Sequence, residues 1–310
     1  MDFETLLSGY LTWDLDVVMG TFEAMPNTWP PPEASTVPSR RLRDVVAPIG
    51  EHAIWSRRTN DDLAKLGLAF APGYLWGRAV GLGDPSRELI ATAFAVYKPE
   101  LVTACYEHAR SQCGRAGFQA AREEATIASL HEILGDADVS ETAAVLRRAT
   151  ESADGSSRIL FCGIRSLGWP DDPMGRLWRA CELLREHRGD SHQAVWVAAG
   201  FSPVAINLLS EAWLGLNFGV YTSIRRGWSE EDIAAAVANL EARGLLAAGE
   251  ITPAGRKFRD DLEEQTDALE QPIVDAIGDD FEATVRALDE WSTAVVATGA
   301  FPPGAYASQQ

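Results

Sequence analysis

The stretch from Trp228 to Asp267 constrains the fold more than any other part of the chain. Ser229 can cap a helix, and apolar residues follow it at helical spacing, at Ile233, Val237 and Leu240. An Ala-Ala-Gly turn between two short apolar segments comes next, and Thr252 is placed to cap a further helix. The pattern predicts a helix, a short hairpin and a long helix.

This order of elements resembles MarR-type winged helices. The residues that carry the resemblance are the Glu241-Ala-Arg-Gly-Leu-Leu segment, the hairpin and the Thr252-Pro-Ala-Gly-Arg segment. The resemblance implies a winged helix over about residues 228–268, with the first helix as the recognition helix and the hairpin as its wing. A module kept only as a packing scaffold would show the same pattern, so the resemblance does not by itself imply DNA binding.

The net charge of the chain disfavours DNA binding. The formal net charge is −18, which repels phosphate backbones and anionic membranes unless a local basic patch overrides it. The exposed face of the expected recognition helix is poor in donors, and consists of Asp232, Ala235, Ala236 and Asn239. Only Asn239 could read a base edge. We therefore expect neither nucleic acid nor a membrane as a partner.

The remaining sequence predicts a mainly α fold in two helical halves. Strand signals are confined to the segment Leu245–Ile251, and the proline-rich run Asn27–Glu33 is expected to be a loop. The small, polar Ser152-Ala-Asp-Gly-Ser-Ser segment is the best linker. It divides the chain into an N-terminal helical domain, residues 1–151, and a helical domain with the winged helix, residues 152–310.

The cysteines and the N-terminus indicate a cytoplasmic protein. None of the four cysteines forms a CxxC pair, and a chain of 310 residues needs no disulfides for stability. The acidic start of the chain does not resemble a signal peptide, and no run of 18 apolar residues occurs. We expect reduced, mostly buried thiols.

The segment around Gly189 is dense in side chains that could take part in catalysis or ligand binding. We expect Gly189 to end one helix and Asp190 to cap the next, so that His187, Arg188, Asp190 and His192 meet at a helix–helix corner. There an aspartate could orient a histidine for acid–base chemistry, which makes His187, Asp190 and His192 candidate catalytic residues. Alternatively, Asp190 only caps a helix, Arg188 pairs with a carboxylate and the histidines face solvent. Histidines five residues apart do not predict a metal site.

The same segment resembles an actinobacterial group of helix-turn-helix family proteins distantly related to MarR. The residues that match are Pro170-Asp-Asp-Pro, Arg176-Leu-Trp and the His-Arg-Gly-Asp-x-His motif that starts at His187. The likeness covers most of residues 165–280. It extends more weakly to His52-Ala-Ile-Trp and to the turn from Trp76 to Gly83, where Gly81 stands in place of the usual proline. It adds His52 and Arg78 to the residues of interest without naming a reaction.

These residues lead to three hypotheses of function. The first is a small-molecule-binding protein or cofactor-independent enzyme. Its pocket would lie between the halves, with Trp55 and Trp196 as walls and His52, Arg78 and Arg188 as polar groups. The second is a MarR-like, ligand-responsive regulator, and the third is an interaction module without a ligand. Core packing is the alternative role for each tryptophan. We expect no cofactor and no metal; the expected partners are a small-molecule ligand or substrate and a second copy of the chain.

Overall fold

The computed structural model describes residues 2–23, 35–303 and 305–306. It is mainly helical with one two-stranded antiparallel sheet, which confirms the prediction of a mainly α fold. The elements are α1 (Phe3–Thr12), α2 (Leu15–Glu23), α3 (Pro38–Trp55), α4 (Arg57–Ala64), α5 (Phe70–Ala79), η1 (Val80–Leu82), α6 (Arg87–Ala93), α7 (Pro99–Gln112), α8 (Arg115–Leu134), α9 (Ser140–Ser152), α10 (Ile159–Arg165), α11 (Pro173–Ala198), α12 (Pro203–Leu214), α13 (Val220–Arg226), α14 (Glu230–Ala242), β1 (Leu246–Ala247), β2 (Glu250–Ile251), α15 (Pro253–Ile277), η2 (Gly278–Asp280) and α16 (Phe281–Val296). The predicted loop Asn27–Glu33 lies outside the described residues.

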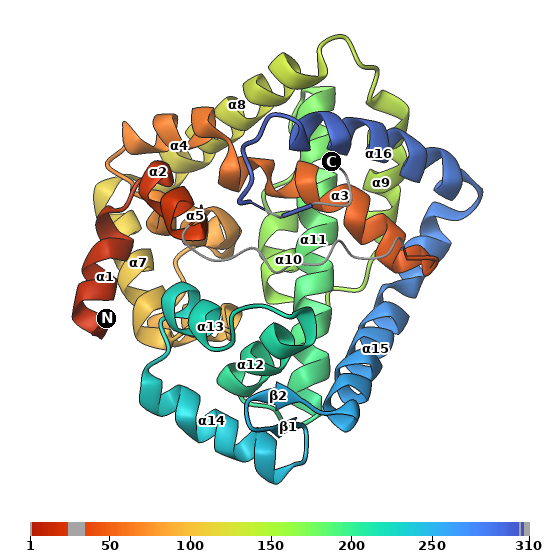
Figure 1. The fold of residues 1–310 in the computed structure, drawn as a ribbon. Helices are drawn as coiled ribbons and strands as arrows, with labels where there is room; N and C mark the ends of the chain where they lie inside the picture. The colour runs from red at the N-terminus through yellow and green to blue at the C-terminus, as the bar shows by residue number, and fades with distance from the viewer. Residues whose placement is uncertain (1, 24–34, 304, 307–310) are drawn as a thin grey trace.

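Helix α11 is the central element of the fold (Figure 1). Asp172 caps it by accepting hydrogen bonds from two backbone amides, and Pro173 occupies its first turn. The helix then runs unbroken for 26 residues, so the predicted helix–helix corner at Gly189 is wrong. A glycine inside a helix costs only about 1 kcal/mol relative to alanine. Burial of Leu184 and Trp196 on either side of Gly189 outweighs that cost.

The largest hydrophobic cluster surrounds the first half of α11. It takes side chains from α3, α8, α9, α15 and α16, among them Ile49, Leu130, Leu146 and Leu288. Residues from both sides of the expected boundary at Ser152 therefore share this core. A second cluster joins α1, α5, α6 and α7. The division at residue 152 stays a prediction about folding units.

The third cluster belongs to the segment that starts at α12. It packs α12 and α14 against β1, α15 and the end of α11, with Leu208, Leu209 and Leu240 fully buried. Ser229 and Asp232 form the capping box of α14, and Thr252 caps α15 by accepting from the amide of Gly255 at 3.0 Å. The predicted order of helix, hairpin and long helix is confirmed at this level.

The hairpin is minimal. Leu246 pairs with Ile251 and Ala247 with Glu250. The two residues between them, Ala248 and Gly249, have φ of 51° and 79°, as a tight two-residue turn requires. The hairpin therefore projects only a few residues from the body of the protein.

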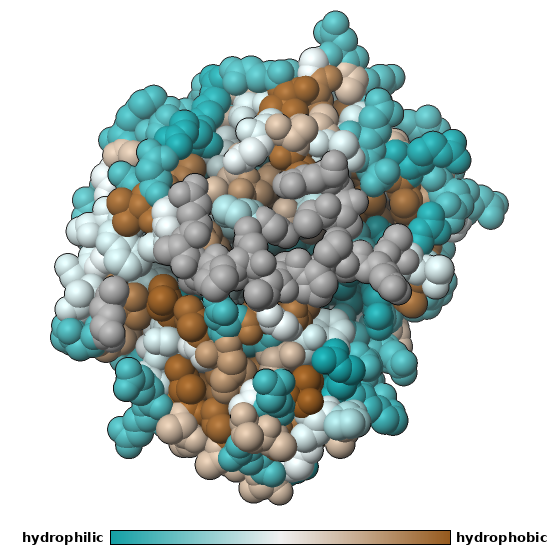
Figure 2. All heavy atoms as spheres, viewed as in Figure 1, coloured by the Kyte–Doolittle hydropathy of each residue, from teal (hydrophilic) through white to brown (hydrophobic). Residues whose placement is uncertain are grey.

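The outer face of α14 differs in part from the predicted one. Ala235 and Asn239 are exposed as expected, but Ala236 is buried against the third cluster. Asp232 is half-buried and pairs with Lys98 at 3.0 Å, which ties the start of α14 to the loop before α7. On the face of the molecule that Figure 2 shows, hydrophobic side chains lie in the region where Figure 1 places α13 and α14.

Two glycines let η1 and α10 approach each other closely. A Cβ atom at Gly81 would lie 1.8 Å from the carbonyl oxygen of Gly163. Only a residue without a side chain fits there, which explains why glycine replaces the proline that the resemblance led us to expect.

The described residues contain no single helix long and apolar enough to cross a membrane. Helices α11 and α12, which meet at an angle of 109°, meet the length and composition criteria only as a bent pair.

Candidate functional site

The four polar side chains of the His-Arg-Gly-Asp-x-His motif point in different directions around α11 and do not converge on one site. Because five residues turn an α-helix through about 500°, His187 and His192 leave it in directions about 140° apart. Nδ1 of His187 lies 2.8 Å from Oε1 of Glu270 on α15. His187 is also 4.9 Å, centroid to centroid, from the ring of Phe161, and it is almost fully buried. It lines none of the cavities described below.

Asp190 points to a different neighbour. Its Oδ2 accepts a hydrogen bond from the backbone amide of Phe161 at 2.9 Å, so it satisfies a free amide in the first turn of α10. Burial raises the pKa of Asp190 to about 7. Asp190 therefore does cap a helix, although the helix is α10 and not the one predicted from the sequence.

Arg188 and His192 both face α15. Arg188 forms ion pairs with Asp267 at 3.0 Å and with Glu263 at 2.9 Å. Nδ1 of His192 lies 3.2 Å from the hydroxyl of Thr266, and burial lowers the pKa of this histidine to about 4. The arginine thus pairs with carboxylates, as the alternative interpretation held, but neither motif histidine faces solvent as that interpretation also assumed.

Three acidic residues of α15 are the partners of α11. Glu263, Asp267 and Glu270 are buried and face α11. The acidic run at residues 260–264 is typical of a solvated helix face, and Asp260 and Glu264 are indeed exposed, whereas Glu263 is not. The i, i+4 and i+7 spacing of the three buried residues places them on one stripe of the helix, and this spacing is the signal that could have identified them.

His52 and Arg78 contact different partners and do not form a common site. Nε2 of His52 lies 2.9 Å from the hydroxyl of Ser129, and burial lowers the pKa of His52 to about 4. Arg78 binds Glu186 through two hydrogen bonds of 2.7 Å and donates to the hydroxyl of Tyr74 at 2.8 Å. His52 lines no cavity, whereas Arg78 lines two.

Three adjoining cavities lie beside α11, and their walls share residues. The first has a volume of about 220 Å³, and the other two have volumes of about 360 Å³ each. Arg185 of α11 lines all three. Of the candidate residues, Trp55 lines the first cavity, and Arg78, Arg188 and His192 line the second. The third is lined by Arg78, Asp190, His192 and Trp196, among others.

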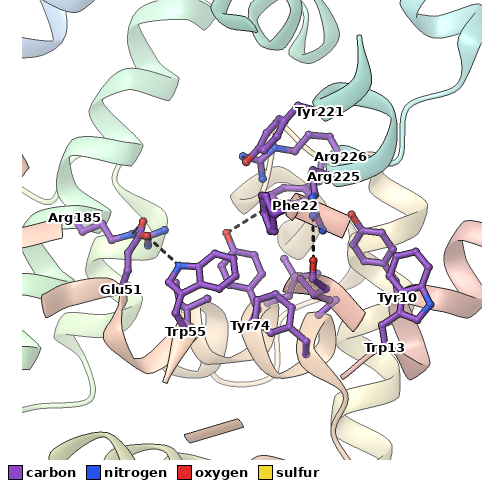
Figure 3. Close-up of a pocket in the computed structure, with 16 residues that line it drawn as sticks. Tyr10, Trp13, Phe22, Glu51, Trp55, Tyr74, Arg185, Tyr221, Arg225 and Arg226 are labelled. Carbon is purple, nitrogen blue, oxygen red and sulfur yellow. Dashed lines mark hydrogen bonds and ion pairs between the residues drawn. The ribbon is translucent and has the colours of Figure 1, made fainter. Parts of the chain in front are cut away.

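The first cavity, which we call the aromatic cavity, has the most distinctive walls. Eight aromatic side chains line it, namely Tyr10, Trp13, Phe22, Trp55, Phe70, Tyr74, Tyr97 and Tyr221. Figure 3 shows Arg225 and Arg226 entering from α13, on the side opposite Trp55 and Tyr74. The indole Nε1 of Trp55 donates to Glu51 at 3.3 Å, and Arg185 binds the same carboxylate at 2.8 Å. Aromatic rings and guanidinium groups therefore face one another across this space.

The phenol of Tyr74, which lines the aromatic cavity, has an unusually low pKa. Its burial alone would raise the pKa of the phenol, but the positive charges of Arg78, Arg185 and Arg226 outweigh burial and lower it to about 8. The hydroxyl of Tyr97 donates to Tyr74 at 3.0 Å. Burial raises the pKa of Tyr97 well above its usual value.

Sequence reasoning missed most of this cavity. Four of the six tyrosines line it, but they are scattered from residue 10 to residue 221. The adjacent arginines at 225 and 226 give no distinctive local signal, because adjacent arginines also occur at 40–41, 57–58 and 147–148. No group of three or more metal-ligating side chains is arranged to hold a metal ion within the described part of the chain.

Comparison with known proteins identifies the family. The family model described as "Helix-turn-helix family" matches residues 39–302, which include α14, the hairpin, α15 and the whole of α11. No curated protein and no solved structure matches the chain. The match covers most of the sequence, and the chain belongs to the helix-turn-helix family.

Proposed function

We propose that the protein binds a small molecule with a planar, apolar body in the aromatic cavity. The observation that carries this proposal is the clustering of eight aromatic side chains around one cavity. They come from α1, α2, α3, α5, α13 and the loops before α2 and α7. Ligand pockets commonly combine apolar walls with a few placed polar groups. Here the polar groups are guanidinium and phenol groups.

This proposal moves the candidate site away from the motif histidines. His187 is buried against Glu270 and lines no cavity, and His192 faces Thr266. Catalysis by His187, Asp190 and His192 stays a prediction. The third cavity shares Arg185 with the aromatic cavity, and a reacting group in contact with both Asp190 and His192 would lie in this third cavity.

Titration with two naphthalene compounds tests the binding proposal. The probes are 2-naphthamide, which is neutral, and 2-naphthoate, which is an anion, followed by calorimetry and by quenching of tryptophan fluorescence. We expect saturable binding of at least one probe. The variant Trp55→Leu removes a ring from the cavity wall and should weaken that binding about fivefold or more.

The matched control is Trp213→Leu. Trp213 lies on α12 outside the aromatic cavity, where its indole donates to Asp260 at 2.8 Å. This variant should bind both probes as the unaltered protein does. If neither probe binds the unaltered protein, or if both tryptophan variants bind equally well, the proposed function is wrong.

A ligand-responsive regulator is the second candidate function, and a structural link between the cavity and α14 favours it. The backbone carbonyl of Arg226 accepts from the amide of Lys98 at 2.8 Å, and Nζ of Lys98 pairs with Asp232 at the start of α14. Between them, Trp228 donates to the carbonyl of Val96 at 3.0 Å. A ligand that moves Arg226 would therefore act on the helix that the MarR-type resemblance makes the recognition helix. In this proposal the protein is a cytoplasmic, MarR-like winged-helix protein of the actinobacterial type.

A gel-shift assay at low salt distinguishes the two functions. The acidic first turn of α14 argues against a grip on DNA, so we expect no tight binding to the promoter of the protein's own gene. Tight, salt-dependent binding that 2-naphthoate alters would establish the regulator instead. Light scattering during gel filtration tests the predicted homodimer.

A further inference from the structure

We infer that the aromatic cavity selects an organic carboxylate, whose acid group binds Arg225 and Arg226 while its apolar body contacts the aromatic walls. This inference rests on the proposed function, since it names the class of the ligand bound at the same site. It concerns the sign of the ligand's charge, which the aromatic walls alone do not decide.

The charged lining of the aromatic cavity has an excess of positive charge. Its charged side chains are Glu51, Arg185, Arg225 and Arg226, which is one carboxylate against three guanidinium groups. Glu51 is already engaged by Arg185, by the hydroxyl of Tyr306 at 2.8 Å and by the indole of Trp55. Arg185 also pairs with Glu186. Arg225 and Arg226 therefore have no carboxylate in the cavity lining to pair with, although the net charge of the molecule is −18.

Arg225 and Arg226 are the two unbalanced groups. Of the residues that the structure describes, none places a carboxylate within ion-pair distance of either guanidinium group. Nε of each arginine is buried without a hydrogen-bond partner in that same part of the chain. Arg225 is 9% exposed and donates to the carbonyl of Val18 at 3.4 Å and to the hydroxyl of Thr21. A buried, unpaired charge is costly, so an anion that pairs with these groups is strongly favoured.

Glu211 interacts electrostatically with Arg226, but its carboxylate already has other hydrogen-bond partners. Glu211 is buried on α12, and its carboxylate accepts hydrogen bonds from the backbone amides of Gly219 and Thr222 and from the hydroxyl of Thr222. These contacts hold Glu211 to the first turn of α13. Its carboxylate therefore anchors the helix that carries the two arginines and does not pair with them.

Aromatic rings hold the two guanidinium groups in place. Cζ of Arg225 lies 3.6 Å from the ring centroid of Phe22, and Cζ of Arg226 lies 4.1 Å from that of Tyr97 and 5.0 Å from that of Tyr221. Stacking covers the faces of a guanidinium group and leaves its edge for hydrogen bonds. A planar carboxylate is the anion that matches such an edge with two parallel hydrogen bonds.

The test compares 2-naphthoate with 2-naphthamide, which have the same ring system and differ in charge. Calorimetry on the unaltered full chain should show naphthoate binding about tenfold tighter or more, as expected for a hydrogen-bonded, charge-assisted contact. Arg226→Gln should weaken the binding of naphthoate much more than that of naphthamide, and so remove this preference. Arg225→Gln should reduce the preference in the same direction.

Arg243→Gln is the matched control. Cζ of Arg243 also lies over an aromatic ring, 4.0 Å from the centroid of Phe201, but Arg243 does not line the aromatic cavity. This variant should keep the full preference for naphthoate. Equal affinities of the two probes for the unaltered protein would overturn the inference and leave the proposed function intact, whereas the absence of binding by both would overturn both. The comparison on the unaltered protein decides the matter even if an arginine variant fails to fold.

Discussion

Glu270 holds His187 in the interior, with Oε1 of the glutamate 2.8 Å from Nδ1 of the imidazole. Ser191 donates to the same oxygen at 2.7 Å, so one carboxylate of α15 satisfies two side chains of α11. A carboxylate can only accept, which places the imidazole proton on Nδ1. A side chain predicted to be catalytic therefore joins two long helices.

We expect Glu270→Ala to destabilise the protein by about 3–5 kcal/mol, because it leaves two buried polar groups without an acceptor. Urea unfolding followed by circular dichroism measures the change. The control is Glu264→Ala, which lies on the exposed side of α15 and should change the free energy of unfolding by less than about 0.5 kcal/mol. Equal effects of the two substitutions would contradict a structural role for this contact.

The burial of His52 predicts a loss of stability in mild acid. Its pKa is about 4 in the folded protein and 6.5 when exposed, so between these values the unfolded chain binds a proton that the folded chain does not. The resulting stability is fully present above pH 6.5 and is lost as the pH falls towards 4. The total is on the order of 3 kcal/mol.

This loss is best measured against His52→Gln, which cannot titrate. The difference in the free energy of unfolding between the two proteins should be constant above pH 6.5 and should decrease below it. The comparison cancels other titrating groups, including His192, whose pKa is also lowered to about 4. A difference that does not vary with pH would show that His52 is not buried as a neutral side chain.

The lowered pKa of Tyr74 predicts that the stability of the folded state changes at alkaline pH. The phenol ionises near pH 8 in the folded protein and near pH 10 in the unfolded chain. The folded state therefore gains stability as the pH rises from 8 to 10, and this contribution is absent below pH 8. Titration followed by tyrosinate absorbance should show an early step that Tyr74→Phe abolishes. An unchanged titration curve in the variant would assign the step elsewhere.

The close approach of η1 and α10 predicts that position 81 accepts only glycine. Gly81→Ala would place a methyl group 1.8 Å from the carbonyl oxygen of Gly163, and the backbone must move to relieve the clash. We expect a loss of about 3 kcal/mol or more in urea unfolding. Gly117→Ala is the control, because a Cβ atom there meets nothing within 4 Å and α8 should gain up to about 1 kcal/mol.

The sequence by itself determined the local structure from Ser229 to Thr252. The cap at Ser229, the cap at Thr252 and the turn between β1 and β2 were all predicted, because each depends on hydrogen bonds or backbone angles within a few residues. The mainly helical fold was predicted for the same reason, from periodicity along single segments.

Only the tertiary structure decided where the polar motif points and where the cavity lies. Gly189 does not end its helix, since the burial of side chains on both sides stabilises α11 more than one glycine weakens it. The directions of His187, Asp190 and His192 follow from that continuity. The aromatic cavity gathers side chains from Tyr10 to Arg226, and a site built from such distant residues leaves no local pattern to read.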